Sequence, residues 1–213
     1  MKFNQKITRH RLRQFLKNYS SNQKTLDVGC GDKYYSDLFP NCVTVDIDKQ
    51  RKPDIVADVY NLPFANDEFE IILCLEVLEH LNNPTRAIFE LKRVLKNGGK
   101  IILSTRFIMT LHDTPNDFLR YTKYGLKELF NDWHIEVLQA ESGTMETVAV
   151  ILQRLIFQIK FKYNKLIKIF LLVLIKIFLF LNKFIKKEFG DIVQKNVEQN
   201  ILSSGYYLVA IKK

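Results

Sequence analysis

Two glycines and two acidic residues stand at the ends of apolar stretches that have the length of buried strands. The stretch Leu26-Asp27-Val28 is followed by Gly29 and Gly31, and a second apolar stretch ends in Asp46, seventeen positions after Gly29. Glycines in such a turn let the backbone approach a ligand where a Cβ atom would collide. An acid at the end of the next strand can accept hydrogen bonds from both hydroxyls of a ribose. The pattern therefore predicts a βαβ unit that binds a nucleoside.

Residue 34 separates two classes of ligand. A dinucleotide-binding fingerprint has a third glycine at this position, and this chain has Tyr34. No Lys-Ser or Lys-Thr pair follows the glycines, which excludes a phosphate-binding P-loop. A nucleoside without a pyrophosphate remains, and S-adenosylmethionine (SAM) is the candidate that fits. The two glycines alone would also suit an ordinary turn between a strand and a helix.

The composition limits the class of protein. A chain of 213 residues with a hydrophobic share of 47% has the size of one globular domain with room for an appendage. Cys30, Cys42 and Cys74 lie in or beside apolar stretches and lack the spacing of metal ligands, so we expect reduced thiols and no metal. Residues 1–19 are basic and amphipathic without the apolar centre of an export signal, which favours a cytoplasmic location.

Short apolar stretches alternate with amphipathic ones along the chain. We expect seven strands, at residues 25–28, 42–46, 55–57, 70–75, 100–104, 134–138 and 205–211. We expect helices at residues 4–19, 34–39 and 123–130, and one more that begins at Asn83-Pro84 and ends before Gly98-Gly99. Residues 105–122 should be mostly loop. Strands that alternate with helices predict an α/β fold with a doubly wound, mostly parallel sheet.

Six motifs occur in an order that is typical of one enzyme family. They are Leu26-Asp27-Val28-Gly29-Cys30-Gly31, Val45-Asp46-Ile47-Asp48, residues 57–64, residues 67–72, Glu76-Val77-Leu78-Glu79-His80 and residues 93–99. Together they resemble the class I SAM-dependent methyltransferases of type 11, over about residues 20–140 and the last strand. The resemblance implies a Rossmann-like, seven-stranded sheet, SAM as the cofactor, and methyl transfer as the reaction.

The expected organisation has three parts. Residues 1–143 would form the SAM-binding core, and residues 144–200 a long, basic, amphipathic helical insertion before the last strand. Residues 201–213 would then return to the core and supply the final strand of its sheet.

The resemblance implies a role for each residue around the first turn. Gly29 and Gly31 would line the methionine half of SAM, and Asp27 would brace that loop. Asp46 would bind the ribose hydroxyls. Simpler roles remain open: Asp27 could cap a following helix, and Asp46 could be a solvated strand end with Asp48 as its rival.

The resemblance also assigns the rest of the pocket. Asp58 would accept a hydrogen bond from the adenine amino group, with Val59 beside the ring, although Asp58 also suits a turn. Leu75 and Glu76, at the end of the fourth strand, would floor the pocket near the transferred methyl. One departure from the family is Lys33, which stands where many relatives have a third glycine.

The loop after the fifth strand holds the candidate for acid–base chemistry. Methyl transfer needs a base only where the acceptor is a hydroxyl that must lose its proton. Residues 112–122 resemble a stretch in methyltransferases associated with bacterial surface-glycan synthesis, and His112 could be the general base because its ordinary pKa is near neutrality. Glu79 and His80 suit the surface of a helix end, and we assign them no catalytic role.

The same loop holds the expected substrate-binding residues. Asp117, Arg120 and Tyr121 lie where the acceptor should enter, and we expect them to contact it. As an alternative, Asp117 and Arg120 could form an ion pair that only fixes the loop.

Residues 151–187 hold all of the chain's excess positive charge. The net charge is +9, and this segment has nine basic residues and no acid, which leaves 23 basic and 23 acidic residues elsewhere. On a helical projection, every basic residue except Lys160 falls with Arg154 in an arc of about 120°. We therefore expect a basic amphipathic helix with a wide apolar face. A nucleic-acid groove would draw its cations from several elements, so no nucleic-acid partner is expected.

Three roles are open for this segment. It could lie in the interface of an anionic membrane, which its wide apolar face and its lysines favour. It could pack, as one helix or two, against the domain or a partner in a homodimer. It could also span a bilayer as a hairpin, but a central lysine would cost about 2.5–3.5 kcal/mol.

We therefore expect a cytoplasmic enzyme, peripheral to the inner face of the cell membrane, that moves a methyl group from SAM to a small-molecule, glycan or lipid-linked acceptor. The alternative from another class is a SAM-binding or scaffolding protein without turnover. A nicotinamide-dependent oxidoreductase is a third reading, against which Tyr34 argues.

Overall fold

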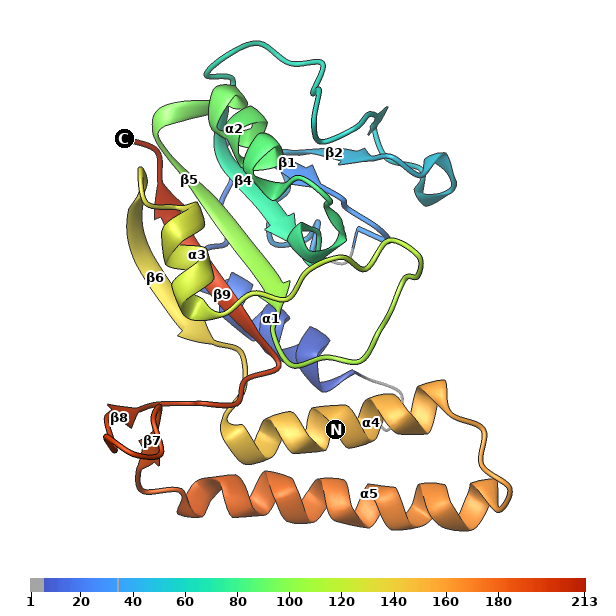
Figure 1. Cartoon of the computed structure of the whole chain (residues 1–213). Helices are drawn as coiled ribbons and strands as arrows, with labels where there is room; N and C mark the ends of the chain where they lie inside the picture. Colours follow the sequence, from blue (N-terminus) through green and yellow to red (C-terminus); the bar gives the residue numbers. More distant parts are fainter. Residues whose placement is uncertain (1–5, 34) are drawn as a thin grey trace.

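The computed structural model describes residues 6–33 and 35–213, so Tyr34 and the first two residues of the predicted helix at 4–19 lie outside the described residues. A seven-stranded sheet in the order β3-β2-β1-β4-β5-β9-β6 forms the centre of the fold (Figure 1). Its strands are β1 (Thr25–Val28), β2 (Cys42–Asp46), β3 (Ile55–Val56), β4 (Phe69–Leu75), β5 (Leu95–Arg106), β6 (His134–Ala140) and β9 (Gly205–Ile211). The predicted doubly wound, mostly parallel sheet is confirmed.

The order of the strands reverses direction at β1, which pairs in parallel with β2 on one side and β4 on the other. The register sets Val28 opposite both Val45 and Cys74, so β1, β2 and β4 end at the same edge of the sheet. A crevice forms at such a switch point, and ligands of open parallel sheets bind there. In the seven-stranded sheet of the described residues, β9 runs antiparallel to its two neighbours, β5 and β6.

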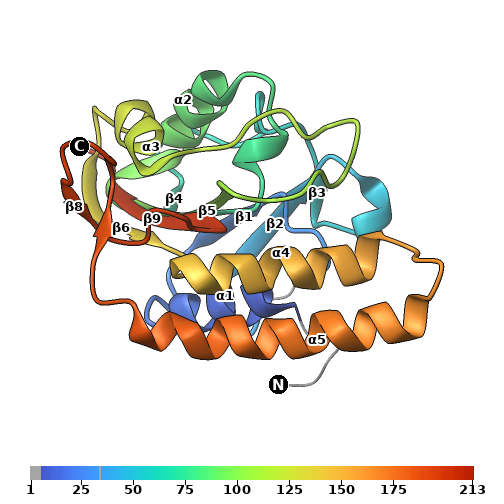
Figure 2. The same ribbon diagram turned by 60° about the horizontal axis from the view of Figure 1, so that its bottom comes forward.

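Helices cover both faces of the sheet (Figure 2). α2 (Pro84–Val94) and α3 (Lys123–Leu129) pack on one face, where Ile72 and Cys74 of β4 point. α1 (Ile7–Lys17) packs on the other face, against Ile71 and Leu73. Because successive strand residues point to opposite faces, the unbroken apolar run of β4 supplies both cores.

The predicted short helix at residues 34–39 is wrong. Residues 35–38 form consecutive turns, in which the Leu38 N–H donates to the Tyr35 carbonyl three positions earlier. Six residues in front of Pro40 are too few to offset the cost of starting a helix. Lys33 has a φ of 53°, a left-handed backbone that glycine adopts without strain, so the departure from the family falls at a strained position.

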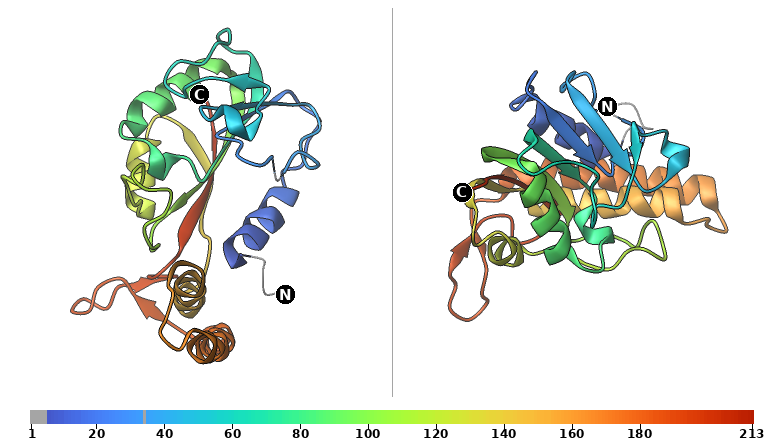
Figure 3. Two further views of the ribbon diagram at one scale, coloured as in Figure 1. Left: turned by 90° about the vertical axis from the view of Figure 1, so that its right-hand side faces the viewer. Right: turned by 90° about the horizontal axis from the view of Figure 1, so that it is seen from above.

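The insertion before the last strand is a helical hairpin rather than one helix. α4 (Thr144–Gln158) and α5 (Asn164–Leu181) lie side by side, and the left view of Figure 3 shows both end-on. Leu171 and Ile175 of α5 pack against Val150 and Ile156 of α4, which buries apolar surface that a single long helix would leave in water. The break explains why the projection of residues 151–187 onto one helix was wrong.

The hairpin lies beyond the edge at which the parallel strands end (Figure 1). After α5 come the short 3₁₀ helix η3 (Asn182–Phe184) and a small ribbon of β7 (Glu188–Phe189) and β8 (Val197–Glu198). The other 3₁₀ helices are η1 (Lys49–Arg51) and η2 (Leu78–His80). Within residues 6–33 and 35–213, no helix is both long and apolar enough to cross a bilayer.

Candidate functional site

A cavity of about 1000 Å³ opens where β1, β2 and β4 end. All eight residues that the sequence assigned to the cofactor line it: Asp27, Gly29, Gly31, Asp46, Asp58, Val59, Leu75 and Glu76. They come from four separate segments of the chain, and the switch point of the sheet brings them together. The size of the cavity is in the range of small-molecule and cofactor sites.

The glycine turn after β1 forms one wall of the cavity. Gly29 has a φ of 67°, and a Cβ atom at this position would lie 2.4 Å from Val77 Cγ2. Gly31 has a φ of 52°, and a Cβ atom there would meet open space. Gly29 is therefore required by packing against Val77, whereas Gly31 leaves room for a ligand.

Asp46 is held in place by the backbone around it. Its Oδ2 accepts a hydrogen bond of 3.0 Å from the Gly31 N–H, and its Oδ1 accepts one of 2.9 Å from the Asp48 N–H. A carboxylate can accept about four hydrogen bonds, so each oxygen keeps capacity for a ligand hydroxyl. The rival Asp48 is engaged elsewhere, because its carboxylate caps η1 by accepting from the Gln50 N–H.

Asp27 does not brace the glycine loop as expected. Within the part of the chain that the structure describes, its carboxylate accepts no hydrogen bond, and no helix follows that it could cap. The loop is held instead by Asp46 and by the Val45 carbonyl, which accepts from the Gly29 and Cys30 N–H groups. Burial, with a contribution from the negative charge of Asp46, raises the pKa of Asp27 to about 7.

Asp27 therefore predicts a pH dependence of stability. Below about pH 4 both folded and unfolded chains hold this proton. Between about pH 4 and pH 7 the unfolded chain loses it first, so stability falls as pH rises, by up to about 1.4 kcal/mol per pH unit, and levels off above pH 7. The side chain of Asp27→Asn cannot lose a proton, so this variant lacks the loss of stability. In urea unfolding at several pH values, the free energy of unfolding of Asp27→Asn relative to that of the unaltered protein should therefore increase from pH 4 to pH 7. A constant difference between the two proteins would contradict the raised pKa.

The two residues predicted to contact adenine, Asp58 and Val59, have other roles in the fold. Asp58 is exposed, and its Oδ1 accepts a hydrogen bond of 3.0 Å from the Tyr60 N–H, so it does serve the turn that was its alternative role. Val59 beside it is 8% exposed and belongs to the core. Both residues line the cavity, and their contact with an adenine ring stays a prediction.

Glu76 directly follows β4 and has a strained conformation, with a φ of 60°. Its carboxylate accepts a hydrogen bond of 2.7 Å from Ser104 Oγ and forms an ion pair with Arg106, which also lines the cavity. Such strain in a non-glycine residue is typical of functional sites, where the surroundings hold it. Glu76 was predicted from the sequence to belong to the site, and Arg106 was not. A cation that follows an apolar strand could have indicated Arg106.

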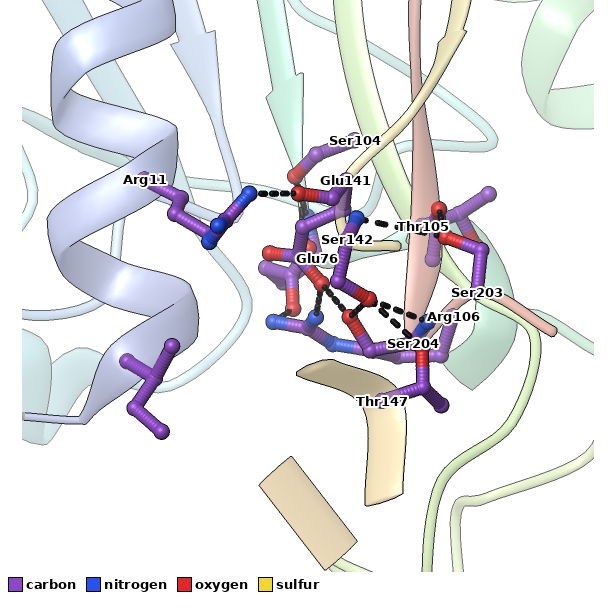
Figure 4. A network of polar contacts seen from close by, with 12 residues as sticks. Arg11, Glu76, Ser104, Thr105, Arg106, Glu141, Ser142, Thr147, Ser203 and Ser204 are labelled. Carbon is purple, nitrogen blue, oxygen red and sulfur yellow. Dashed lines mark hydrogen bonds and ion pairs between the residues drawn. The ribbon is translucent and has the colours of Figure 1, made fainter. Parts of the chain in front are cut away.

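A buried polar network connects this site to the base of the hairpin (Figure 4). Arg106 forms a second ion pair, with Glu141, whose side chain is fully buried. Glu141 also accepts a hydrogen bond of 2.6 Å from Ser204 Oγ. Ser142 Oγ bridges Ser204 Oγ and Thr147 Oγ1 of α4, at 2.8 and 2.7 Å. The network therefore fixes the first turn of α4 relative to Glu76.

His112 also lines the cavity. Its Nδ1 lies 3.2 Å from the Thr110 carbonyl, which can only accept, so Nδ1 carries the proton and Nε2 is left as a proton acceptor. Burial lowers the pKa of His112, an effect that the nearby Asp117 partly opposes, and the ring is therefore neutral near pH 7.

The three predicted substrate-binding residues have structural roles. Asp117 forms a bidentate ion pair with Arg120, at 2.6 and 2.7 Å, and also accepts from the His112 N–H. Arg120 holds the pKa of Asp117 well below its ordinary value. Tyr121 is buried, and its hydroxyl donates to the Leu78 carbonyl. None of the three is among the residues that line the cavity, because the ion pair turns inward to fix the loop.

His80 belongs to the site, although the sequence indicated only a helix surface. It lines the cavity, and its ring lies 4.9 Å from that of His112 between centroids. Its Nδ1 is 2.6 Å from the Asn116 carbonyl. The preceding residue, Glu79, is buried. Glu79, His80 and His112 each have one potential metal-ligand atom that lies within 4.8 Å of the other two. The trio is compact enough to be considered for a metal ion, which the spacing of the cysteines did not indicate.

Arg154 also lies elsewhere than expected. The helical projection put it among the basic residues of a membrane-facing arc, but it lines the cavity. It belongs to α4, and the lysines of α5 follow the break at residues 159–163, so the two sets do not share one helical face.

Residues 26–103 match the family model described as a methyltransferase domain. The chain is similar to the demethylmenaquinone methyltransferase of Renibacterium salmoninarum, with 31% identity over 122 residues that cover 50% of each protein. It is also similar to the tRNA (carboxymethyluridine(34)-5-O)-methyltransferase of Arabidopsis thaliana, with 32% identity over 103 residues, 42% of this chain and 26% of that protein. Among solved structures, a SAM-dependent methyltransferase from Archaeoglobus fulgidus has a TM-score of 0.61 at 13% identity, covering 97% of this chain and 93% of that one.

These similarities differ in what they establish. The structural likeness, at such low identity, shows that the sheet has the Rossmann-like fold of the methyltransferases. The chain spans about half or less of the length of the curated relatives named above. The name of the relative from Arabidopsis thaliana gives a tRNA nucleoside as the group that this enzyme methylates.

Proposed function

We propose that this chain, whose residues 26–103 form a SAM-dependent methyltransferase domain, moves a methyl group from SAM to a glycan, lipid-linked or other small-molecule acceptor at a membrane surface. The observation that carries the proposal is the convergence of the eight predicted cofactor residues on one cavity at the switch point of the sheet. The location is proposed to be cytoplasmic, at the inner face of the cell membrane.

The residues present fit this cofactor. When bound, SAM supplies a methyl group activated by a positively charged sulfonium. Asp27 and Asp46 place two carboxyl groups close to each other in the cavity, and a cationic ligand favours the ionised form of Asp27. The space beside Gly31 admits a ligand against the backbone, and the fixed carboxylate of Asp46 has spare acceptor capacity for a ribose.

The chain's own residues would then orient the acceptor and take its proton. His112 lines the cavity, and its neutral ring keeps Nε2 as a proton acceptor, which suits a general base for a hydroxyl acceptor. The Asp117–Arg120 ion pair fixes the loop that carries His112. The ion pair between Glu76 and Arg106 holds the floor of the cavity rigid. In a methyl transfer, rigid positioning of the two reactants is the main contribution that a protein makes.

The hairpin supports a membrane location. α5 and η3 expose one apolar face, made of Leu166, Ile169, Phe170, Val173, Ile177, Phe180, Leu181 and Phe184. Exposed lysines, among them Lys165, Lys176 and Lys183, flank this face. An apolar face with lysines beside it is typical of a helix that lies in a membrane interface. Gln158 at the end of α4 donates to the Leu111 carbonyl, next to His112, so the hairpin adjoins the acceptor loop.

We expect the exposed face to bind anionic vesicles. Replacing both Phe170 and Phe180 by Ser should weaken binding by about tenfold or more, because two large apolar side chains no longer insert. Phe89→Ser is the matched control, since Phe89 is 73% exposed on α2, away from the hairpin. Sedimentation with vesicles measures the effect, and wild-type binding should fall with neutral lipid and with high salt.

A charge variant tests the same surface independently. Glutamate at the positions Lys165, Lys168, Lys176 and Lys183 should release the protein from anionic vesicles while the core stays folded. A monodisperse protein that ignores anionic vesicles without detergent would contradict the membrane location and leave the apolar face to a homodimer interface.

Comparing the binding of SAM and NAD by calorimetry tests the cofactor. Binding of SAM, but not of NAD, is expected from the two-glycine turn and the acids of the cavity. A protein that binds NAD and not SAM would be an oxidoreductase candidate instead.

A tRNA acceptor is the second candidate, and the similarity to the tRNA methyltransferase of Arabidopsis thaliana favours it. The two candidates differ in their acceptor, so incubation with SAM and either tRNA or membrane lipids, followed by a search for a 14-dalton increase, separates them.

A further inference from the structure

Cations gather on the side of the cavity that faces the hairpin. Lys6 and Arg9 come from the start of α1, and Arg154 comes from α4. The acids that suit the cofactor come from the strand ends instead. The cavity is therefore divided into an acidic part at the sheet and a basic part beside the hairpin.

Arg154 lies in the wall of the cavity without a counterion. Within residues 6–33 and 35–213, its guanidinium has neither an ion pair nor a hydrogen bond. Burial lowers the pKa of Arg154, and the charge of Arg106 lowers it further. Arg106 is already neutralised by Glu76 and Glu141. A partly buried cation without a partner costs free energy, and an anion in the cavity would offset it.

Lys6 is in the same situation. Among the described residues its ammonium has no ion pair, and its pKa is lowered by burial and then by the positive charge of Arg154. The acid that most opposes these effects is Asp113, whose side chain is 79% exposed. Asp113 lies beyond ion-pair distance of both cations. Two cations that line one cavity and repel each other are an arrangement that a doubly charged anion stabilises.

We propose that Lys6 and Arg154 form a subsite for a phosphate or diphosphate group on the acceptor. This inference deepens the proposed function, because it names the chemistry that the acceptor carries. A guanidinium can donate two hydrogen bonds to a phosphate, and a lysine adds a point charge. Arg154 stands on α4, and α5 of the same hairpin exposes the apolar face, so the subsite and the proposed membrane-facing surface belong to one segment of the chain.

Titration with inorganic pyrophosphate tests the subsite in the full-length protein saturated with S-adenosylhomocysteine. Pyrophosphate should bind the unaltered protein, and Arg154→Gln and Lys6→Gln should each weaken this binding by about tenfold or more. Lys160→Gln is the matched control, because Lys160 is exposed and does not line the cavity. Arg154→Lys, which keeps the charge but not the fork of donors, should restore part of the affinity, and circular dichroism confirms that each variant is folded.

The results distinguish this inference from the function on which it rests. Equal pyrophosphate binding by Arg154→Gln and the unaltered protein, or no binding by either, overturns the subsite. A loss of SAM affinity in Arg154→Gln also overturns it, because the cations would then hold the carboxylate of the cofactor, and the methyltransferase function would stand. Failure of the unaltered protein to bind SAM would instead defeat the proposed function.

A second arm identifies the source of the phosphate. Neutral phosphatidylcholine vesicles that contain a polyprenyl diphosphate should bind the unaltered protein better than plain vesicles, and Arg154→Gln should remove the difference. Pyrophosphate should compete with these vesicles. If pyrophosphate binds and the doped vesicles add nothing, the subsite takes a soluble phosphate, and the lipid source is overturned.

Discussion

Replacing His112 by alanine should lower the turnover rate by about two to four orders of magnitude while SAM binding stays intact. A positioned general base contributes this much to a reaction in which the acceptor must lose a proton. The ring is neutral near pH 7, and its Nδ1 is bonded to the Thr110 carbonyl, so Nε2 is ready to accept. Because burial lowers the pKa of His112, turnover should persist at a pH at which an exposed histidine would already be protonated.

Single-turnover kinetics in the presence of acceptor measure this effect. His134→Ala is the control, since His134 is exposed at the edge strand β6 and does not line the cavity. A rise in the acceptor KM with an unchanged kcat would make His112 a positioning residue. Full activity in His112→Ala would remove it from the site, and His80, the neighbouring ring, would be the next candidate.

Asp46→Ala should weaken SAM binding by roughly a hundredfold, and by no less than tenfold. Each hydrogen bond from a ribose hydroxyl to the carboxylate contributes about 1.5–3 kcal/mol. The loss also frees the Gly31 N–H, which Asp46 holds at 3.0 Å. Asp46→Asn should retain part of the affinity, because the amide oxygen still accepts a hydrogen bond.

Asp48→Ala is the matched control for this prediction. Asp48 also lines the cavity, two residues further on, but its carboxylate caps η1. We expect it to change SAM affinity by less than Asp46→Ala does. Calorimetry measures both, and an unchanged affinity in folded Asp46→Ala would remove Asp46 from the ribose site.

The strands and the cofactor end of the cavity follow from local features of the sequence. β1, β2 and β9 have the predicted bounds, because mostly apolar stretches of this length form the buried strands of a sheet that is covered on both faces. The positions of Gly29 and Asp46 then follow, since the ends of parallel strands meet at one edge.

The hairpin and the acceptor side depend on contacts between distant residues, which one sequence does not reveal. The helical pattern continues through residues 159–163 without glycine or proline, so the break has no local signal. It arises because α5 folds back on α4. The contact between Arg106 and Glu141 joins β5 to residues after β6, and Arg154 reaches the cavity only because the hairpin turns.

The ion pair that fixes the loop after β5 could not be predicted from the sequence alone. Asp117 and Arg120 are three residues apart, and this spacing suits either substrate binding or an internal ion pair. The burial of the Asp117 side chain, 1% exposed, decides for the ion pair. His80 enters the site because residues 112–116 fold over it, which places the Asn116 carbonyl on its Nδ1.

The formation of S-adenosylhomocysteine from SAM by the full-length protein tests the central claim most directly. The protein would be incubated with SAM and a panel of membrane lipids, lipid-linked glycans and tRNA, with Asp46→Ala as the inactive control. We predict that the product forms with a lipid or lipid-linked glycan fraction, that an acceptor gains 14 daltons, and that the control forms neither. Tight SAM binding without product across the whole panel would contradict the account and identify a SAM-binding protein without turnover.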